Sequence, residues 1–171
     1  YSVEDLFSLV IQHNLENTRI VMKLLIPTVN TKDMPWTYPM LEKYLPSALR
    51  STCFNEEKLP FAVEVRRTEI GHLFEHILLE YLCQEKLLKG YDKAIFSGNT
   101  QWNWRRDPRG MFHIYINLHY SDADIFPEAL EKSIALAKMI LRNETEQSYN
   151  PYPLLPEVKN SSAASLLSAK E

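Results

Sequence analysis

Two histidines and a glutamate within five residues are the strongest chemical signal in this sequence. They are His72, Glu75 and His76, in the pattern H-x-x-E-H. On a helix, residues four apart share a face and lie about 6 Å apart along the axis, so both imidazoles can bind one divalent cation. Zinc suits such ligands, and its bound water becomes a usable nucleophile near neutral pH. Glu75 is placed to carry a proton from that water to a leaving amine, so the pattern predicts a metal-dependent hydrolase.

A catalytic zinc site needs a third protein ligand, and the five-residue pattern does not supply it. Glu80 is the nearest candidate, because it continues the helical row of His72 and His76 and its side chain leans back toward them. If Glu80 does not reach the ion, it can instead orient His76 through the second ring nitrogen. Other residues held in reserve as ligands are Glu64, Glu69, His113 and His119.

A second cluster combines tryptophan and arginine in a polar turn. Its members are Trp102, Trp104, Arg105, Arg106 and Arg109. One interpretation is a substrate-binding lip, in which arginine forks bind carboxylates and tryptophan faces stack on cations. The other is a solvated turn whose tryptophans pack onto the domain. The sequence leaves both open.

The helix that carries the histidines is predicted over residues 68–89. Its core stripe has helical spacing and consists of Ile70, Leu73, Phe74, Ile77, Leu78, Tyr81 and Leu82. Thr68 is expected to be the N-cap, and Gly90 is expected to end the helix. His72, His76 and Glu80 fall on a different face, which we expect to line a cleft.

The remaining pattern mixes strands and helices irregularly. Strands are predicted over residues 18–26, 60–66, 94–100 and 112–120, the last two as a hairpin. Helices are predicted over residues 2–10, 39–53 with an interruption at Pro46, and 125–141. This pattern favours an α+β fold, with helices packed on a small, mostly antiparallel sheet. We expect one domain over residues 1–142 and a loosely ordered, proline- and serine-rich tail over residues 143–171.

Composition excludes several classes of protein. Hydrophobic residues make up 45% and charged residues 24% of the 171 residues, the balance of a globular domain. The net charge of −3 argues against nucleic-acid binding. No apolar run approaches the about 20 residues that cross a bilayer, so no membrane partner is expected. The two cysteines, Cys53 and Cys83, form no disulfide framework and are expected to be small apolar residues in a cytoplasmic protein.

The run from Thr68 to Glu80 resembles the T-x-I-G-H-x-x-E-H-x-x-L-E signature in the amino-terminal domain of cyanophycin synthetases. The resemblance extends over roughly residues 18–142. It includes Leu45-Pro46, Cys53 upstream of the motif, and the Gly98-Asn99-Thr100 segment before the second hairpin strand.

This resemblance implies an α+β module, which in some family members cuts the Asp/Arg polymer cyanophycin with a bound metal. It further implies His72, His76 and Glu80 as metal ligands and Glu75 as the base. The expected function is therefore hydrolysis of cyanophycin or a related Asp/Arg isopeptide with Zn²⁺ or another divalent metal. The alternative is a non-catalytic module that binds a polymer or a partner, as in other family members. A pitrilysin-like peptidase is a third, weaker candidate, and a homo-oligomer stays open.

Overall fold

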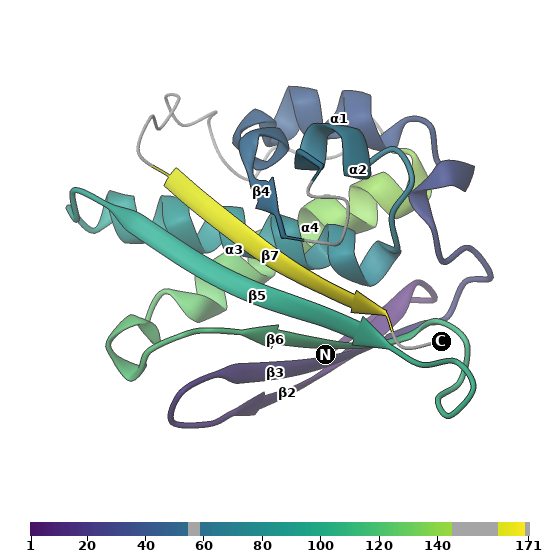
Figure 1. Ribbon diagram of the computed structural model, residues 1–171, viewed down its shortest axis with the longest axis horizontal. Helices are drawn as coiled ribbons and strands as arrows, with labels where there is room; N and C mark the ends of the chain where they lie inside the picture. Colours follow the sequence, from purple (N-terminus) through teal and green to yellow (C-terminus); the bar gives the residue numbers. More distant parts are fainter. Residues whose placement is uncertain (55–58, 145–160, 170–171) are drawn as a thin grey trace.

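The computed structural model describes residues 1–54, 59–144 and 161–169, the last segment by its backbone. Its strands form one sheet in the order β1-β2-β3-β6-β5-β7-β4 (Figure 1). The strands are β1 (Ser2–Val3), β2 (Phe7–His13), β3 (Thr18–Leu24), β4 (Thr52–Cys53), β5 (Ala94–Trp102), β6 (Met111–Ile116) and β7 (Ser161–Ala169). The α-helices are α1 (Thr37–Tyr44), α2 (Phe61–Glu64), α3 (Ile70–Leu88) and α4 (Phe126–Arg142).

The predicted α+β class is confirmed. Neighbouring strands pair antiparallel along the first five positions of the sheet, which are β1, β2, β3, β6 and β5. The strand β7 runs parallel to both of its neighbours, β5 and β4. β3 and β6 bury alternate residues, as a sheet does when one face packs on a core. Helices α3 and α4 lie on one side of the sheet, and α1 and α2 lie near the β4 edge (Figure 1).

Helix α3 is the central element of the core, because it packs against the sheet on one side and against α4 on another. It approaches the sheet very closely at Gly71, where an added Cβ would lie 2.4 Å from Cγ of Phe112 on β6. A side chain at this position would push the helix away from the sheet. Gly71 therefore sets the depth at which the following residue, His72, is held.

Two predicted elements have a different secondary structure. Residues 2–10 were expected to be helical, but they form β1 and β2, which pair in register with each other and with β3. Pairing of β2 with the whole length of β3 outweighs the weak local helix signal. The strand expected over residues 60–66 is the short helix α2, which begins directly after Pro60, a residue suited to a helix start. The interruption expected at Pro46 is confirmed, since a 3₁₀ helix, Pro46–Arg50, follows α1.

The C-terminal segment differs from expectation within its described part. Residues 161–169 belong to the segment predicted as a loosely ordered tail, yet they form β7 between β5 and β4. The backbone hydrogen bonds that two neighbouring strands offer give even a sequence of low strand propensity a place in a sheet. Residues 145–160, which carry the prolines of that segment, lie outside the described residues.

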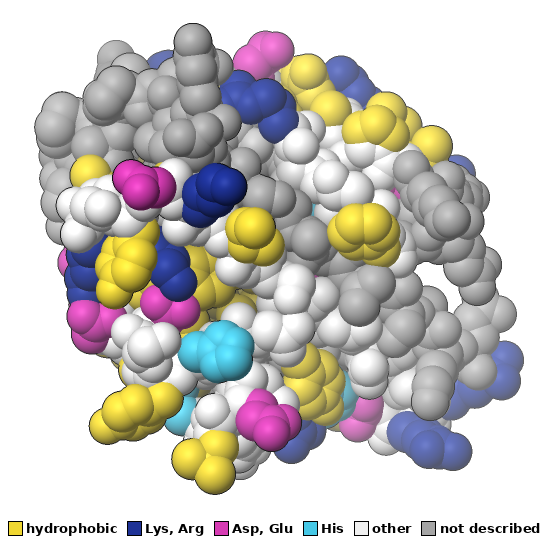
Figure 2. All heavy atoms as spheres, turned by 60° about the vertical axis from the view of Figure 1, so that its left-hand side comes forward, with side chains coloured by type: hydrophobic (Ala, Val, Ile, Leu, Met, Phe, Trp, Pro, Cys, Tyr) yellow, Lys and Arg dark blue, Asp and Glu magenta, His cyan; other side chains and the backbone are white. Residues whose placement is uncertain are grey.

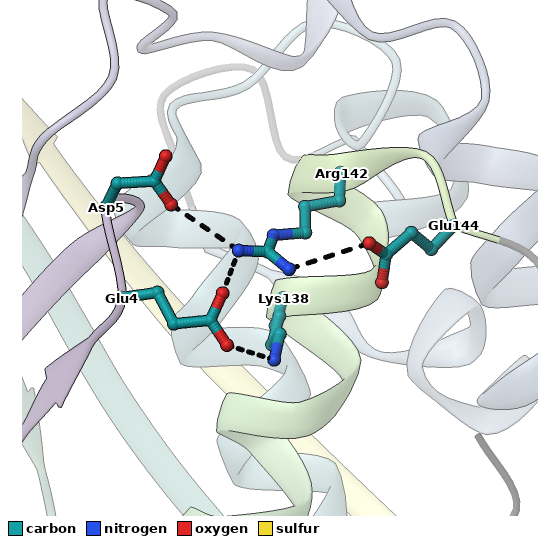
Figure 3. A network of polar contacts seen from close by, with 5 residues as sticks. All are labelled: Glu4, Asp5, Lys138, Arg142 and Glu144. Atoms are coloured by element: carbon teal, nitrogen blue, oxygen red, sulfur yellow. Dashed lines mark hydrogen bonds and ion pairs between the residues drawn. The ribbon is translucent and has the colours of Figure 1, made fainter. Parts of the chain in front are cut away.

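A surface ion-pair network joins the C-terminal part of α4 to the turn between β1 and β2 (Figure 3). Glu4, in the turn between β1 and β2, pairs with Lys138 and Arg142 of α4. Arg142 also lies 3.4 Å from Asp5 and 3.6 Å from Glu144. Exposed pairs contribute about 0–1 kcal/mol each, so this network orients the first hairpin more than it stabilises the core.

The surface shown in Figure 2 is mixed in character. Hydrophobic side chains are scattered among acidic and basic ones over the described part of this face. Scattered hydrophobic residues of this kind are ordinary for a protein surface. Within the described ranges, no helix has the length and apolar content required to cross a bilayer.

We predict that Gly71→Ala destabilises the fold by about 1–3 kcal/mol, because the new methyl group overpacks the contact with Phe112. The better helix propensity of alanine offsets up to about 1 kcal/mol of this loss. Urea unfolding measures the free energy of unfolding. The cost of Gly71→Ala should fall in a Phe112→Leu background, and an equal cost in both backgrounds would show that the contact is not the cause.

Candidate metal centre

Three buried side chains from two elements converge on one point. Cys53 comes from the edge strand β4, and His72 and His76 come from α3. Their ligand atoms all lie within 4.8 Å of one another. The two Nε2 atoms are 3.1 Å apart, and Sγ of Cys53 lies 3.7 Å from Nε2 of His72 and 3.2 Å from Nε2 of His76.

These separations fit a tetrahedral metal site. Zinc bonds of about 2.0–2.1 Å to nitrogen and 2.3 Å to sulfur place tetrahedral ligand atoms about 3.3 Å apart for two nitrogens and about 3.5 Å apart for nitrogen and sulfur. The distances between Cys53, His72 and His76 lie within a few tenths of an ångström of those values. Thiolate and imidazole are ligands that zinc prefers, and three protein ligands leave a fourth position for water. The donor set therefore fits a zinc ion.

The hydrogen bonds around His76 direct a nitrogen lone pair at that point. The hydroxyl of Ser51 donates to the carbonyl oxygen of Ala48 over 2.6 Å. The same hydroxyl oxygen lies 2.6 Å from Nδ1 of His76, so it accepts the Nδ1 proton. His76 is thereby held as the tautomer with an unprotonated Nε2, which is the form that binds a metal. Stacking of Phe61 on the imidazole, at 3.7 Å between ring centroids and 11° between ring planes, fixes the ring orientation.

His72 has an equivalent partner one turn earlier on the helix. Its Nδ1 lies 2.7 Å from Oγ1 of Thr68. Thr68 was expected to cap the helix through its side chain, but Glu69 occupies the N-cap position, with no side-chain cap hydrogen bond. The backbone of Thr68 is anchored instead by Thr31, which accepts from its amide and donates to its carbonyl oxygen. The hydroxyl of Thr68 is thus used to position a candidate ligand.

Burial controls the protonation of all three groups. Desolvation lowers the pKa of His72 to about 3, and it lowers the pKa of His76 well below 6.5 with a further contribution from His72. Both imidazoles are therefore neutral and able to act as ligands at physiological pH. Desolvation, followed by the charges of Glu64 and Glu75, raises the pKa of Cys53 to about 12.

The protonation of Cys53 separates two chemical roles. A nucleophilic cysteine needs a lowered pKa, as produced by a neighbouring cation or a helix N-terminus. The thiol of Cys53 is shifted in the opposite direction, so it is a poor nucleophile without an ion. A divalent cation at the centre of the three groups would reverse this shift, because a coordinating thiol is deprotonated outright. The electrostatics favour Cys53 as a ligand.

Glu75 is buried on the side of α3 that faces the sheet. Its Oε2 accepts a hydrogen bond from Oγ1 of Thr100 on β5. Its Oε1 lies so close to Gly98 that a Cβ there would be 2.6 Å away. Glu75 is not one of the three convergent donors, but its charge acts on Cys53. Glu75 is thus outside the set of donors but near enough for its charge to raise the pKa of Cys53, which is compatible with the predicted role in proton transfer.

The other candidate ligands lie elsewhere. Glu80 is buried, but it is outside the convergent group, and its Oε1 accepts a hydrogen bond from Gln84 over 3.4 Å. Glu69 accepts a hydrogen bond from Asn30, and His119 is exposed. His113 lies on the open face of the sheet, where Arg19 donates to Nδ1 and Nε2 donates to Asp107, both at 3.1 Å. Glu64 is outside the convergent group, and its charge raises the pKa of Cys53.

The tryptophan and arginine cluster forms the hairpin between β5 and β6. Trp102 and Trp104 pack edge-on against Phe112, at 6.1 and 5.8 Å between ring centroids. Arg109 stacks over Trp104, and Arg105 and Arg106 are exposed. Both tryptophans thus pack against the hydrophobic core at Phe112, the residue that Gly71 approaches closely. A substrate-binding role for the cluster stays a prediction.

Sequence reasoning missed Cys53 as a ligand and treated it as a small apolar residue. The available signal was a cysteine upstream of a two-histidine motif that still needed a third ligand. Cys53 lies 19 positions before His72 and beyond a turn and a short helix, so spacing alone does not bring them together. The topology does so, because β4 joins the sheet beside the first half of α3.

No protein-family model, curated protein or solved structure matches this chain. The resemblance to the amino-terminal domain of cyanophycin synthetases therefore stays a prediction from the motif.

We predict that acid destabilises the metal-free protein through His72 and His76. Each takes up a proton near pH 6.5 when unfolded but resists it when folded, so the free energy of unfolding falls as the pH drops below 6.5. The limiting slope is about 1.4 kcal/mol per pH unit for each histidine.

Urea unfolding of chelator-treated protein between pH 7 and pH 5 measures this slope. His76→Gln should remove roughly half of the histidine contribution, whereas a variant of the exposed His119 is the control. An unchanged slope in His76→Gln would contradict the burial of a neutral imidazole at this position.

Proposed function

We propose that this protein is a metal-dependent hydrolase of an amide bond, with Cys53, His72 and His76 as ligands. The convergence of two Nε2 atoms and one Sγ at separations suited to a tetrahedral ion carries this proposal. Three protein ligands are typical of catalytic zinc, whereas a structural zinc is usually closed by four. A bound zinc ion would act as a Lewis acid and would lower the pKa of a coordinated water to about 7.

The residues around the candidate metal centre have two further roles, which are to orient the ligands and to transfer a proton. Ser51 and Thr68 hold the two imidazoles through Nδ1, so that both Nε2 atoms would be available to bind the metal. Thr100 and Gly98 fix Glu75, which takes a proton from the attacking water and gives it to the leaving amine. The net reaction breaks the amide C–N bond, forms a C–O bond with the water oxygen, and yields a carboxylic acid and an amine.

The substrate and the cellular location are proposed from the sequence motif and from the cysteines. The resemblance of the motif points to cyanophycin or a related Asp/Arg isopeptide as the substrate. Neither Cys53 nor Cys83 is in a disulfide, as is typical of a reducing compartment, and this supports a cytoplasmic location.

We predict that the protein binds one Zn²⁺ or Co²⁺ per chain. Cys53→Ser should reduce metal affinity by more than the about 10–100-fold expected when an outer partner such as Ser51 is changed to Ala. Cys83→Ser is the matched control, since Cys83 is also buried but lies in the second half of α3, where its thiol donates a hydrogen bond to the carbonyl oxygen of Ala94. Elemental analysis gives the stoichiometry, and loss of the sulfur-to-cobalt charge-transfer absorption in Cys53→Ser identifies the ligand. Equal absorption in both cysteine variants would remove Cys53 from the site.

We predict that Glu75→Gln lowers kcat by about 10²–10⁴-fold and leaves metal content unchanged. Release of new amino groups from cyanophycin, followed with and without chelator, measures this effect. Hydrolysis by Glu75→Gln at the wild-type rate, or full activity after metal removal, would refute the proposed mechanism.

A further inference from the structure

The last described strand occupies an unusual place beside the metal centre. β7 lies between β5 and β4, parallel to both (Figure 1). Among the described strands, β4 pairs only with β7, and it contributes two residues, Thr52 and Cys53. A nine-residue segment from the end of the chain therefore fills the gap between the main sheet and the strand that carries a candidate ligand.

The register places the middle of this segment at the centre itself. Ser165 is the partner of Gly98 on one side and of Cys53 on the other. Gly98 is the residue against which the Glu75 carboxylate rests, and Cys53 is a proposed metal ligand. In the sheet, the backbone at Ser165 therefore lies between Gly98, which the proposed base contacts, and Cys53, a proposed ligand. A hydrolase must hold the bond that it cuts close to both groups.

The segment has the composition of a weakly held strand. Its sequence, SSAASLLSA, contains no β-branched and no aromatic residue, whereas β3 reads TRIVMKL. Pairing through backbone N–H and C=O groups does not depend on side chains, so another extended peptide can make the same hydrogen bonds. If β7 occupies a binding slot between β5 and β4, its presence there also explains why His72, Glu75 and His76 are buried.

We propose that the slot between β5 and β4 is the binding site for an extended peptide substrate, and that the chain's own residues 161–169 occupy it as an intramolecular competitor. This inference rests on the proposed hydrolase function. Substrate would add to β5 as β7 does, with its amide carbonyl between Gly98 and Cys53. The tethered segment competes at a millimolar effective concentration, so the protein with β7 in place has low activity toward added peptide.

The first test is Ser165→Pro in the 171-residue chain. Proline removes a backbone N–H from the middle of β7 and should loosen the segment. A fluorescently labelled synthetic peptide SSAASLLSA should then bind at least tenfold more tightly than it binds the wild type, as measured by anisotropy. Ser165→Ala, which keeps the backbone N–H, is the matched control and should behave as the wild type. A folded Ser165→Pro variant that binds the peptide no better than the wild type would overturn the proposal.

The second test decides the matter if Ser165→Pro does not fold. Ile95 and Ser162 are register partners on β5 and β7, and adjacent strands lie about 4.8 Å apart, within the range that a disulfide spans. In the double cysteine variant, oxidation should lock β7 in place and weaken peptide binding at least tenfold relative to the phosphine-reduced form. Equal binding in the two forms would overturn the proposal.

The readouts separate this inference from the proposed function. Anisotropy requires no turnover, so peptide binding can be observed even where hydrolysis is absent. That result would support the peptide-binding site between β5 and β4 and would refute the hydrolase function. Metal bound equally by the oxidised and reduced forms, with hydrolysis lost at least tenfold on oxidation, supports both. Metal-dependent hydrolysis that is the same in both forms would retain the hydrolase and refute the slot.

Discussion

The burial of a polar motif inside the helical core is the constraint on which the rest of this structure depends. Helix α3 carries His72, Glu75, His76 and Glu80, and each is at most 1% exposed. Buried polar groups are costly unless they are hydrogen-bonded or bound to a metal, so the surrounding elements must supply partners. The sheet supplies Thr100 to Glu75, the segment after α1 supplies Ser51 to His76, and α3's own approach supplies Thr68 to His72.

The three partners, Ser51, Thr68 and Thr100, come from three different segments of the chain, and each forms a hydrogen bond with one buried polar side chain of the helix. The arrangement brings the two Nε2 atoms and the sulfur of Cys53 within 3.1–3.7 Å of one another. Three neutral donors at such short range are most strongly stabilised by a shared cation, because the ion replaces weak mutual contacts with coordinate bonds. The hydrogen bonds to Nδ1 do for the imidazoles what outer partners do in known metal sites, namely fix the tautomer and the ring orientation.

Placement of β7 links the metal centre to the architecture of the sheet. The antiparallel strands form a complete platform for α3 and α4, and β4 stands apart from it as an edge that needs another strand to join the sheet. The strand that fills this position is also the one that crosses between Gly98 and Cys53. β7 therefore both joins β4 to the sheet and runs beside the candidate metal centre.

Much of the helical and hairpin structure was predictable, because it follows from local periodicity. The apolar stripe of residues 68–89 and the alternation over residues 112–118 need only a nearby apolar surface to become α3 and β6. The first residues were mispredicted, since β2 is a strand by virtue of its pairing with β3, which lies later in the chain. Residues 161–169 likewise show no strand pattern of their own and gain a place from two neighbours.

The sequence by itself determined that His72 and His76 share one helical face with Glu75 beside them, because helical geometry alone fixes those spacings. It also determined the hydrophobic faces and therefore the α+β class. Only the tertiary structure decided that this face is buried, that Cys53 rather than Glu80 completes the set of donors, and that the sheet places Gly98 and Thr100 against Glu75. The physical reason is that these contacts join residues separated by 19 or more positions, and such contacts depend on strand order and close packing rather than on any local pattern.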